Sequence, residues 1–191
     1  PILSIADKKI LSCEALARWQ HPQRGMILPE EFIPLAEEGG LIIALDLWVL
    51  RQACKQTREW QKAIPGAADL MVNVNFSGKH FNRIDLVDKI TGVLQEADFS
   101  PCNLILEFSE KALAENETLA TPLFNDLASL GIQIHVDDFG TGRTSLEQLA
   151  AGSLDIIFAV DMFNEGIDIP AIDTVIMLRP TESSTIWLQQ F

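Results

Sequence analysis

Apolar residues recur along this chain in two patterns, one typical of helices and one typical of buried strands. From residue 69 onward, short apolar runs alternate with longer stretches that have helical spacing. The predicted strands are 69–75, 104–108, 132–137, 155–160 and 173–178. The predicted helices are 84–97, 115–130, 145–151 and 183–190. This alternation predicts an α/β fold built on a parallel sheet.

The first third of the chain follows a different order. Residues 1–19 predict two strands joined by a turn at 7–9. Residues 30–38 follow a proline and precede two glycines, which are the start and stop signals of a helix. Residues 41–61 predict a long amphipathic helix. Its apolar positions are Leu41, Leu45, Trp48, Val49, Ala53 and Trp60.

Oxygen-bearing side chains occur at successive predicted strand ends, namely at Glu14, Asn75, Glu107 and Asp137. The carboxyl ends of parallel strands meet at one edge, in a barrel and in a doubly wound sheet alike. Mg²⁺ and Mn²⁺ prefer such oxygen ligands. One carboxylate at a strand end usually caps a helix or faces water, whereas four at equivalent places favour a metal site. Asp138 adds an adjacent carboxylate, which either bridges metals or is a second exposed acid before a turn.

Composition excludes some classes of function. The chain has 191 residues and a formal net charge of −13, which disfavours non-specific nucleic-acid binding. Its three cysteines are odd in number and widely spaced, so we expect reduced thiols and a cytoplasmic location. No apolar run approaches the roughly 18 residues of a membrane span, and we see no secretory signal. The chain could also be a fragment of a larger protein.

Four short motifs follow one another with characteristic spacing. They are 13–19 (CEALARW), 73–77 (NVNFS), 107–110 (EFSE) and 137–142 (DDFGTG). This ordered set resembles the EAL domain family, the bacterial phosphodiesterases that hydrolyse cyclic di-GMP, over residues 2–142. The resemblance implies a TIM-type (β/α) barrel and cyclic di-GMP as the small-molecule partner.

The same resemblance implies roles for individual residues. In the family, one Mg²⁺ or Mn²⁺ is held by the positions matching Glu14, Asn75, Glu107 and Asp137. The position of Asp138 helps to hold a second ion, and two such ions clamp the attacking and leaving oxygens of a phosphodiester. The position of Arg18 faces a substrate phosphate, which suits the fixed fork of guanidinium donors. The position of Glu110 steadies the loop that follows the next strand, here 138–142.

The family pattern fails after residue 142. Phe158 stands where the family has a Lys that orients or activates the attacking water, so no catalytic residue of that kind is assigned. Strand 173–178 ends in Arg179 and Pro180, where the family has a Glu that supplies a metal ligand. Loss of one positioned acid–base group costs about 10²–10⁴ in rate. We therefore expect impaired or absent turnover.

Residues 143–191 resemble instead motif V, and the approach to motif VI, of a superfamily-two helicase. The resemblance lies in 161–170 (DMFNEGIDIP) and 179–184 (RPTESS). The chain lacks the phosphate loop and a basic groove, so a nucleic-acid motor is not expected. We expect one EAL-like barrel domain over 1–191, in which 1–142 are EAL-derived and 143–191 replace its last units and complete the sheet only in part. An open sheet edge invites pairing, so a homodimer is a further expectation.

Three functions stay open on the sequence. The first is an EAL-type cyclic di-GMP phosphodiesterase, impaired or inactive. The second is a non-catalytic module that binds cyclic di-GMP or a metal ion. The third is a chimeric scaffold without a biological ligand. Turnover separates the first from the second, and saturable binding that requires Arg18 and Glu14 separates the second from the third.

Overall fold

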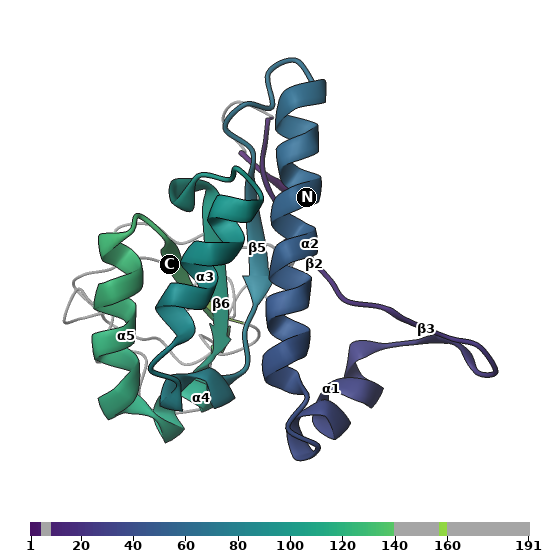
Figure 1. Cartoon of the computed structure of the whole chain (residues 1–191), viewed down its shortest axis with the longest axis vertical. Coiled ribbons are helices and arrows are strands. Elements are labelled where there is room, and N and C mark those ends of the chain that lie inside the picture. The colour runs from purple at the N-terminus through teal and green to yellow at the C-terminus, as the bar shows by residue number, and fades with distance from the viewer. Residues whose placement is uncertain (5–8, 140–156, 160–191) are drawn as a thin grey trace, which may run out of the picture.

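The computed structural model describes residues 1–4, 9–139 and 157–159, and its centre is a six-stranded sheet ordered β1-β2-β5-β6-β7-β8 (Figure 1). Strand β1 pairs antiparallel with β2, and every other neighbouring pair in this sheet is parallel. The predicted α/β fold with a parallel sheet is thus confirmed for the described part of the chain. The strands are β1 (Ile2–Leu3), β2 (Ile10–Ala15), β5 (Met71–Asn75), β6 (Leu104–Ser109), β7 (Gln133–Phe139) and β8 (Ile157–Ala159).

Helices gather on one face of this sheet. The long helix α2 contacts β5, α5 contacts β7, and α3 packs between these two helices (Figure 1). The predicted helices at 30–38, 41–61, 84–97 and 115–130 are all present, and α4 is an additional short helix directly after β6. The helices are α1 (Pro29–Glu38), α2 (Ile42–Ala63), α3 (Leu86–Glu96), α4 (Glu110–Glu115) and α5 (Glu117–Ser129), with 3-10 turns η1 (Gly78–Asn82) and η2 (Pro101–Asn103).

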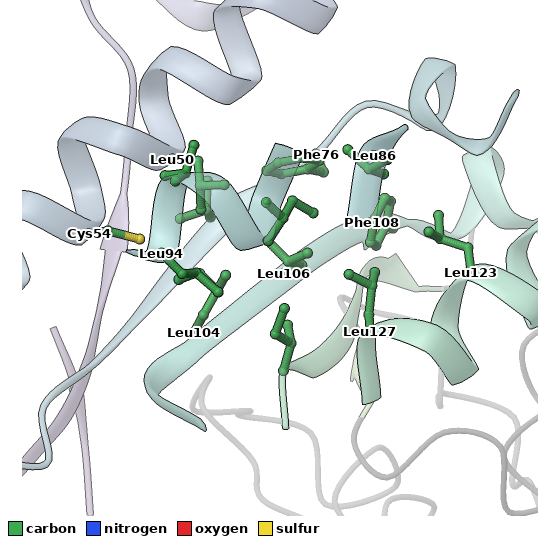
Figure 2. Close-up of a cluster of buried hydrophobic side chains, with 14 of the residues drawn as sticks. Leu50, Cys54, Phe76, Leu86, Leu94, Leu104, Leu106, Phe108, Leu123 and Leu127 are labelled. Atoms are coloured by element: carbon green, nitrogen blue, oxygen red, sulfur yellow. The ribbon is translucent and has the colours of Figure 1, made fainter. Parts of the chain in front are cut away.

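The apolar core lies between the sheet and these helices. Val74, Leu106 and Phe108 point from neighbouring strands into a cluster that includes Leu50 of α2 and Leu127 of α5 (Figure 2). Burial of a large apolar side chain contributes about 1.5–3 kcal/mol, so this cluster is the main source of stability for the described fold. Four phenylalanine rings pack against one another in it, with centroids 5.1–6.1 Å apart, namely Phe76, Phe81, Phe108 and Phe124.

The opposite face of the sheet is polar. Residues paired in register on parallel strands share a face, and Asn75, Glu107 and His135 form one such row across β5, β6 and β7. Glu14 and Asn73 are paired one step toward the start of the strands, and Ser109 and Asp137 one step beyond. Alternation along each strand therefore sends the residues of the main apolar cluster to the helices, while the other face carries these polar side chains together with Met71 and Ile105.

The N-terminal strands differ from the prediction. The predicted second strand continued to Trp19, but β2 ends at Ala15 and Trp19 begins a separate hairpin. This hairpin consists of β3 (Trp19–His21) and β4 (Gly25–Ile27), which extend away from the main sheet (Figure 1). His21 Nδ1 accepts hydrogen bonds from two backbone N–H groups of the turn, and Gly25 has a φ of +75°. The His-Pro-Gln-Arg-Gly stretch is thus a tight turn.

The phase of helix α2 also differs from the prediction. Leu41 and Trp48, assigned to its apolar stripe, are 66% and 54% exposed. The buried positions are Ile42, Asp46, Leu50, Cys54, Thr57 and Gln61. Polar residues on this face have partners, since Gln61 Nε2 donates to the Leu70 carbonyl oxygen over 2.8 Å. Ile84, assigned to the stripe of the following helix, is fully exposed and precedes α3.

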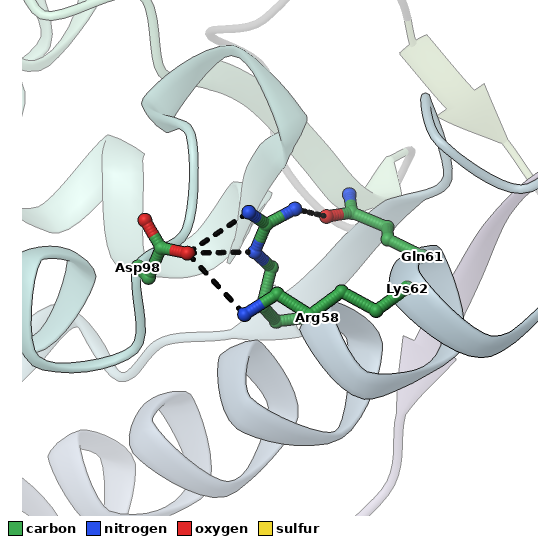
Figure 3. A network of polar contacts seen from close by, with 4 residues as sticks. All are labelled: Arg58, Gln61, Lys62 and Asp98. Atoms are coloured by element: carbon green, nitrogen blue, oxygen red, sulfur yellow. Dashed lines mark hydrogen bonds and ion pairs between the residues drawn. The ribbon is translucent and has the colours of Figure 1, made fainter.

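Charged side chains fasten the end of α2 to the segment after α3 (Figure 3). Asp98 Oδ2 accepts from Arg58 Nη2 over 2.9 Å and lies 3.3 Å from Lys62 Nζ. The hydrogen bond from Arg58 is the first cause that lowers the pKa of Asp98, and the contact with Lys62 acts in the same direction. This network is far from the polar row and belongs to the scaffold.

The closure of the barrel falls on residues outside those described. The same holds for the predicted helices 145–151 and 183–190 and for strand 173–178, whereas β8 lies within the predicted strand 155–160. The described part is an α/β half-barrel. Among its helices, none is both long and apolar enough to cross a membrane.

Candidate functional site

Four predicted ligand residues lie at one edge of the sheet. Asn75 ends β5, and Glu107 stands beside it on β6 in register. Glu14 comes from the last part of β2, and Asp137 from β7. Parallel pairing explains this meeting, because it brings the carboxyl ends of strands distant in sequence to the same edge. The structure therefore places Glu14, Asn75, Glu107 and Asp137 at the same edge of the sheet.

Two amide groups hold two of these carboxylates. Asn75 Nδ2 donates to Glu14 Oε1 over 3.0 Å, and Asn73 Nδ2 donates to Glu107 Oε1 over 2.6 Å. His135 Nδ1 lies 3.9 Å from the same Glu107 oxygen. One of these bonds thus joins β2 to β5, and the other joins β5 to β6.

Glu107 is the most buried of these acids, with 7% of its surface exposed. Burial is the largest cause that raises its pKa, because a low-dielectric surrounding disfavours the charged form. The hydrogen bond from Asn73 lowers the pKa, while the negative charges of Glu14 and Asp137 raise it. Glu107 therefore experiences both carboxylates, which is the electrostatic condition that a bound cation would relieve.

A pocket of about 490 Å³ opens at this edge. Asn75, Glu107 and Asp137 line it from the sheet, and Glu37 and Asp46 line it from helices α1 and α2. Its wall combines acids and amides with apolar side chains, a composition usual for small-molecule sites. The apolar part comes from Ala15, Leu16, Ala17, Pro29, Ile33, Pro34, Ile42, Leu45, Val49 and Phe76.

A second polar cluster, missed by the sequence analysis, supports the segment after Asn75. Asp46 Oδ2 accepts from the Ser77 backbone N–H over 3.0 Å and lies 3.0 Å from His80 Nε2. Ser77 Oγ donates to Glu37 Oε1 over 2.6 Å. Asp46 and His80 are both buried, so each satisfies the other where no water reaches. A polar residue within an apolar helix pattern, as Asp46 is, was the available signal.

The other predicted residues have different places. Arg18 is exposed, lies between β2 and β3, and donates from Nη1 to the Ala17 carbonyl oxygen over 2.8 Å. Glu110 is buried at the start of α4, but most of the loop 138–142 that it was predicted to steady lies outside the described residues. Asp138 belongs to β7 and Phe158 to β8.

The donor set fits a hard divalent cation in its chemistry. Carboxylate and amide oxygens are the ligands that Mg²⁺ and Mn²⁺ prefer. Over the described ranges, no three His, Cys, Asp or Glu side chains are gathered closely enough to hold an ion. Amide nitrogens of Asn73 and Asn75 occupy one oxygen each of Glu107 and Glu14. Rotation of the Asn75 amide would turn its oxygen toward the acids.

Comparison with known proteins identifies the family. The EAL domain model matches residues 1–167, and the chain belongs to this family. The match continues past residue 142, where the sequence analysis placed a change of family. Solved structures similar to this chain have the TIM-like barrel of EAL domains. The described half-barrel corresponds to part of that barrel.

Two relatives are at least 40% identical to this chain over the aligned residues. The cyclic di-GMP phosphodiesterase NbdA of Pseudomonas aeruginosa is 42% identical over 171 residues, which are 90% of this chain and 21% of that protein. The cyclic di-GMP phosphodiesterase PdeR of Escherichia coli is 40% identical over 149 residues, which are 78% of this chain and 22% of that protein. The chain thus spans about a fifth of the length of these relatives.

Solved structures show the same fold. The MucR phosphodiesterase in complex with c-di-GMP superposes with a TM-score of 0.71 at 38% identity, covering 77% of this chain and 59% of that chain. The EAL enzyme Bd1971, bound to cAMP and cyclic di-GMP, gives a TM-score of 0.73 at 33% identity, with coverage of 83% and 43%.

Proposed function

We propose that this chain binds cyclic di-GMP at the carboxyl edge of its sheet and hydrolyses one phosphodiester bond slowly, giving the linear dinucleotide. The observation that carries the proposal is the meeting of Glu14, Asn75 and Glu107 at that edge, beside an acid-lined pocket. Family membership and relatives whose names state cyclic di-GMP phosphodiesterase activity support the same ligand.

Mg²⁺ or Mn²⁺ is the cofactor in this proposal, held by Glu14, Asn75, Glu107, Asp137 and Asp138. When bound, such ions polarise the phosphodiester and lower the pKa of water. The chain's own residues position the cofactor and the substrate. Asn75 and Glu107 orient ligand oxygens, and Arg18 binds a phosphate oxygen of the substrate through its guanidinium. Glu110 fixes the loop after β7 from its buried position at the start of α4.

Turnover is slow in this proposal because of Phe158. In a phenyl ring there is no group that could hold or move a proton, whereas the family has a Lys at the matching position. Loss of one such group costs about 10²–10⁴ in rate. Phe158 also favours the second candidate function, a module that binds cyclic di-GMP without hydrolysing it. A chimeric scaffold without a ligand is the third.

Two features of the chain beyond the site stay predictions. One is the helicase resemblance of 143–191, which would make the chain a chimera. The other is a homodimer formed through an open edge of the sheet. A cytoplasmic location is likewise a prediction from the cysteines and the composition.

Incubation of the purified chain with cyclic di-GMP and Mn²⁺, followed by chromatography, tests the proposal. We expect slow formation of the linear dinucleotide, absent in Glu14→Ala and at least tenfold slower in Arg18→Ala. Glu38→Ala is the matched control, because Glu38 is an exposed acid that does not line the pocket.

Titration of cyclic di-GMP in Ca²⁺ separates the alternatives. Saturable binding without any product supports the binding module. Absence of both binding and product contradicts every cyclic di-GMP function and leaves the scaffold.

A further inference from the structure

Asn73 lies beneath the proposed ligand row without belonging to it. It is two residues before Asn75 on β5 and shares the polar face of the sheet. Its neighbours in register are Glu14 on β2 and Ile105 on β6. Asn73 is 0% exposed and does not line the pocket, so it cannot contact a substrate placed there.

Stability alone does not account for an asparagine at this position. Asn is depleted in strands, and a buried amide is favourable only when both its nitrogen and its oxygen are hydrogen-bonded. The nitrogen of Asn73 reaches Glu107 Oε1 over 2.6 Å, but no partner for Oδ1 is found in the described part of the chain. The side chain is therefore paired on one side only, toward Glu107.

The contacts on Glu107 are also one-sided. Asn73 Nδ2 donates to Oε1 from β5, and His135 Nδ1 lies 3.9 Å from the same oxygen on β7. Glu107 itself lines the pocket. The hydrogen bond from Asn73 restrains the rotation of the carboxylate about its last bond and leaves Oε2 on the other side.

We propose that Asn73 is a positioning residue, which holds Glu107 Oε1 so that Oε2 is presented to a divalent cation. The inference rests on the proposed function, because that function supplies the cation. Groups that orient metal ligands typically change metal affinity by about 10–100-fold when removed. Asn73 acts here only through Glu107.

Direct measurement of Mn²⁺ binding by calorimetry tests the role without relying on turnover. We expect Asn73→Ala to bind Mn²⁺ at least tenfold more weakly than the unaltered chain. Asn73→Ser is a second, milder variant, whose hydroxyl is too short to reach Glu107, and we expect the same direction. If circular dichroism shows that Asn73→Ala is not folded, the Mn²⁺ affinity of Asn73→Ser tests the role instead.

Asn103→Ala is the matched control. Asn103 is a half-buried asparagine at the other end of the sheet, where its Nδ2 donates to the Leu70 carbonyl oxygen over 3.4 Å. This variant removes an amide and one weak hydrogen bond without touching Glu107. Its Mn²⁺ affinity should stay within twofold of the unaltered chain, whatever its urea midpoint.

The outcomes are distinct. A lower urea midpoint in the Asn73 variants with unchanged Mn²⁺ affinity means that Asn73 is merely structural, and the inference fails while the proposed function stands. The inference is supported if Asn73→Ala or Asn73→Ser binds Mn²⁺ more weakly while Asn103→Ala keeps the affinity of the unaltered chain. No Mn²⁺ binding by the unaltered chain overturns the proposed metal site, and this inference with it.

Discussion

The side-chain amide of Asn75 donates a hydrogen bond to the carboxylate of Glu14 across 61 positions of sequence and 3.0 Å of space. The bond joins the ends of two parallel strands, β2 and β5. The amide hydrogen bond also stabilises the charged form of the carboxylate.

Removal of Glu14 should abolish stabilisation by Mn²⁺. A ligand that binds only the folded state adds RT ln(1 + [L]/Kd), about 2.7 kcal/mol at a hundred times Kd. We expect Mn²⁺ to raise the Tm of the unaltered chain by several degrees and to leave the Tm of Glu14→Ala unchanged. Scanning fluorimetry over a Mn²⁺ series measures both. Equal Tm increases in the two proteins would remove Glu14 from the ligand set.

Glu107→Gln should stabilise the metal-free protein at neutral pH. Burial, followed by the charges of Glu14 and Asp137, raises the pKa of Glu107 above its ordinary value of 4.5. The ionised form is thus disfavoured in the fold, whereas Gln keeps an oxygen that accepts from Asn73. The measurement is the Tm in EDTA, where we expect the variant to melt a few degrees higher at pH 8.

The pH dependence of this difference has a definite sign. A raised acid pKa contributes stability that is fully present below the unfolded value and is lost as pH rises through the folded value. The advantage of Glu107→Gln should therefore be absent near pH 4, grow above pH 4.5 and then level off. An advantage that is equal at pH 4 and pH 8 would show that charge is not its cause.

Asp46→Ala should lower the free energy of unfolding by more than most single substitutions do. It leaves the Ser77 N–H and the buried His80 ring without their acceptor. Each buried group left unpaired costs about 1–3 kcal/mol, so we expect a loss of about 2–5 kcal/mol in urea unfolding. Asp126→Ala, an exposed acid on α5, should change the free energy of unfolding by less than about 0.5 kcal/mol. A small effect of Asp46→Ala would mean that water replaces the carboxylate.

Gly78→Ala should create a clash that a second change removes. A Cβ at Gly78 would lie 2.7 Å from the Cβ of Ala112, which joins η1 to α4 in close contact. Such overpacking costs about 1–3 kcal/mol. The double variant Gly78→Ala with Ala112→Gly should recover part of that loss, although Gly inside a helix costs up to about 1 kcal/mol. Strictly additive losses in urea unfolding would contradict a direct clash.

Phe158→Lys should raise the hydrolysis rate. The change supplies the Lys that the family resemblance implies at this position of β8. We expect initial rates with cyclic di-GMP and Mn²⁺ to rise at least tenfold. Ile157→Lys is the control, since it adds the same charge one strand position earlier. A rate increase in both variants would point to charge alone, and no increase in Phe158→Lys would assign the slow turnover to another defect.

Sequence periodicity predicted most of the described strands and helices, but not β3, β4 and α4, nor the rotation of α2. Counting apolar residues selected Leu41, Trp48 and Trp60, which are exposed, and passed over Asp46 and Gln61, which are buried. These two polar residues face the core because His80 and the Leu70 carbonyl oxygen satisfy them there. Such partners come from elsewhere in the fold, so the helix pattern alone could not reveal them.

The position of Glu14, Asn75, Glu107 and Asp137 at one edge was predictable, because a polar residue after an apolar run marks a strand end in the sequence. The sequence did not single out Asn73, because this residue lies within the strand. Its proposed role depends on a hydrogen bond to Glu107 on the neighbouring strand. Register between strands far apart in sequence determined this pairing, and a single sequence does not state that register.

The two faces of the sheet separate folding from chemistry. The main apolar cluster lies on the helix-covered face, while Glu14, Asn73, Asn75 and Glu107 share the other face. Substitutions on the polar face can therefore alter or erase a reaction while the chain still folds. An EAL domain is for this reason well suited to drift between enzyme and receptor, and loss of activity in one of its members need not mean loss of shape.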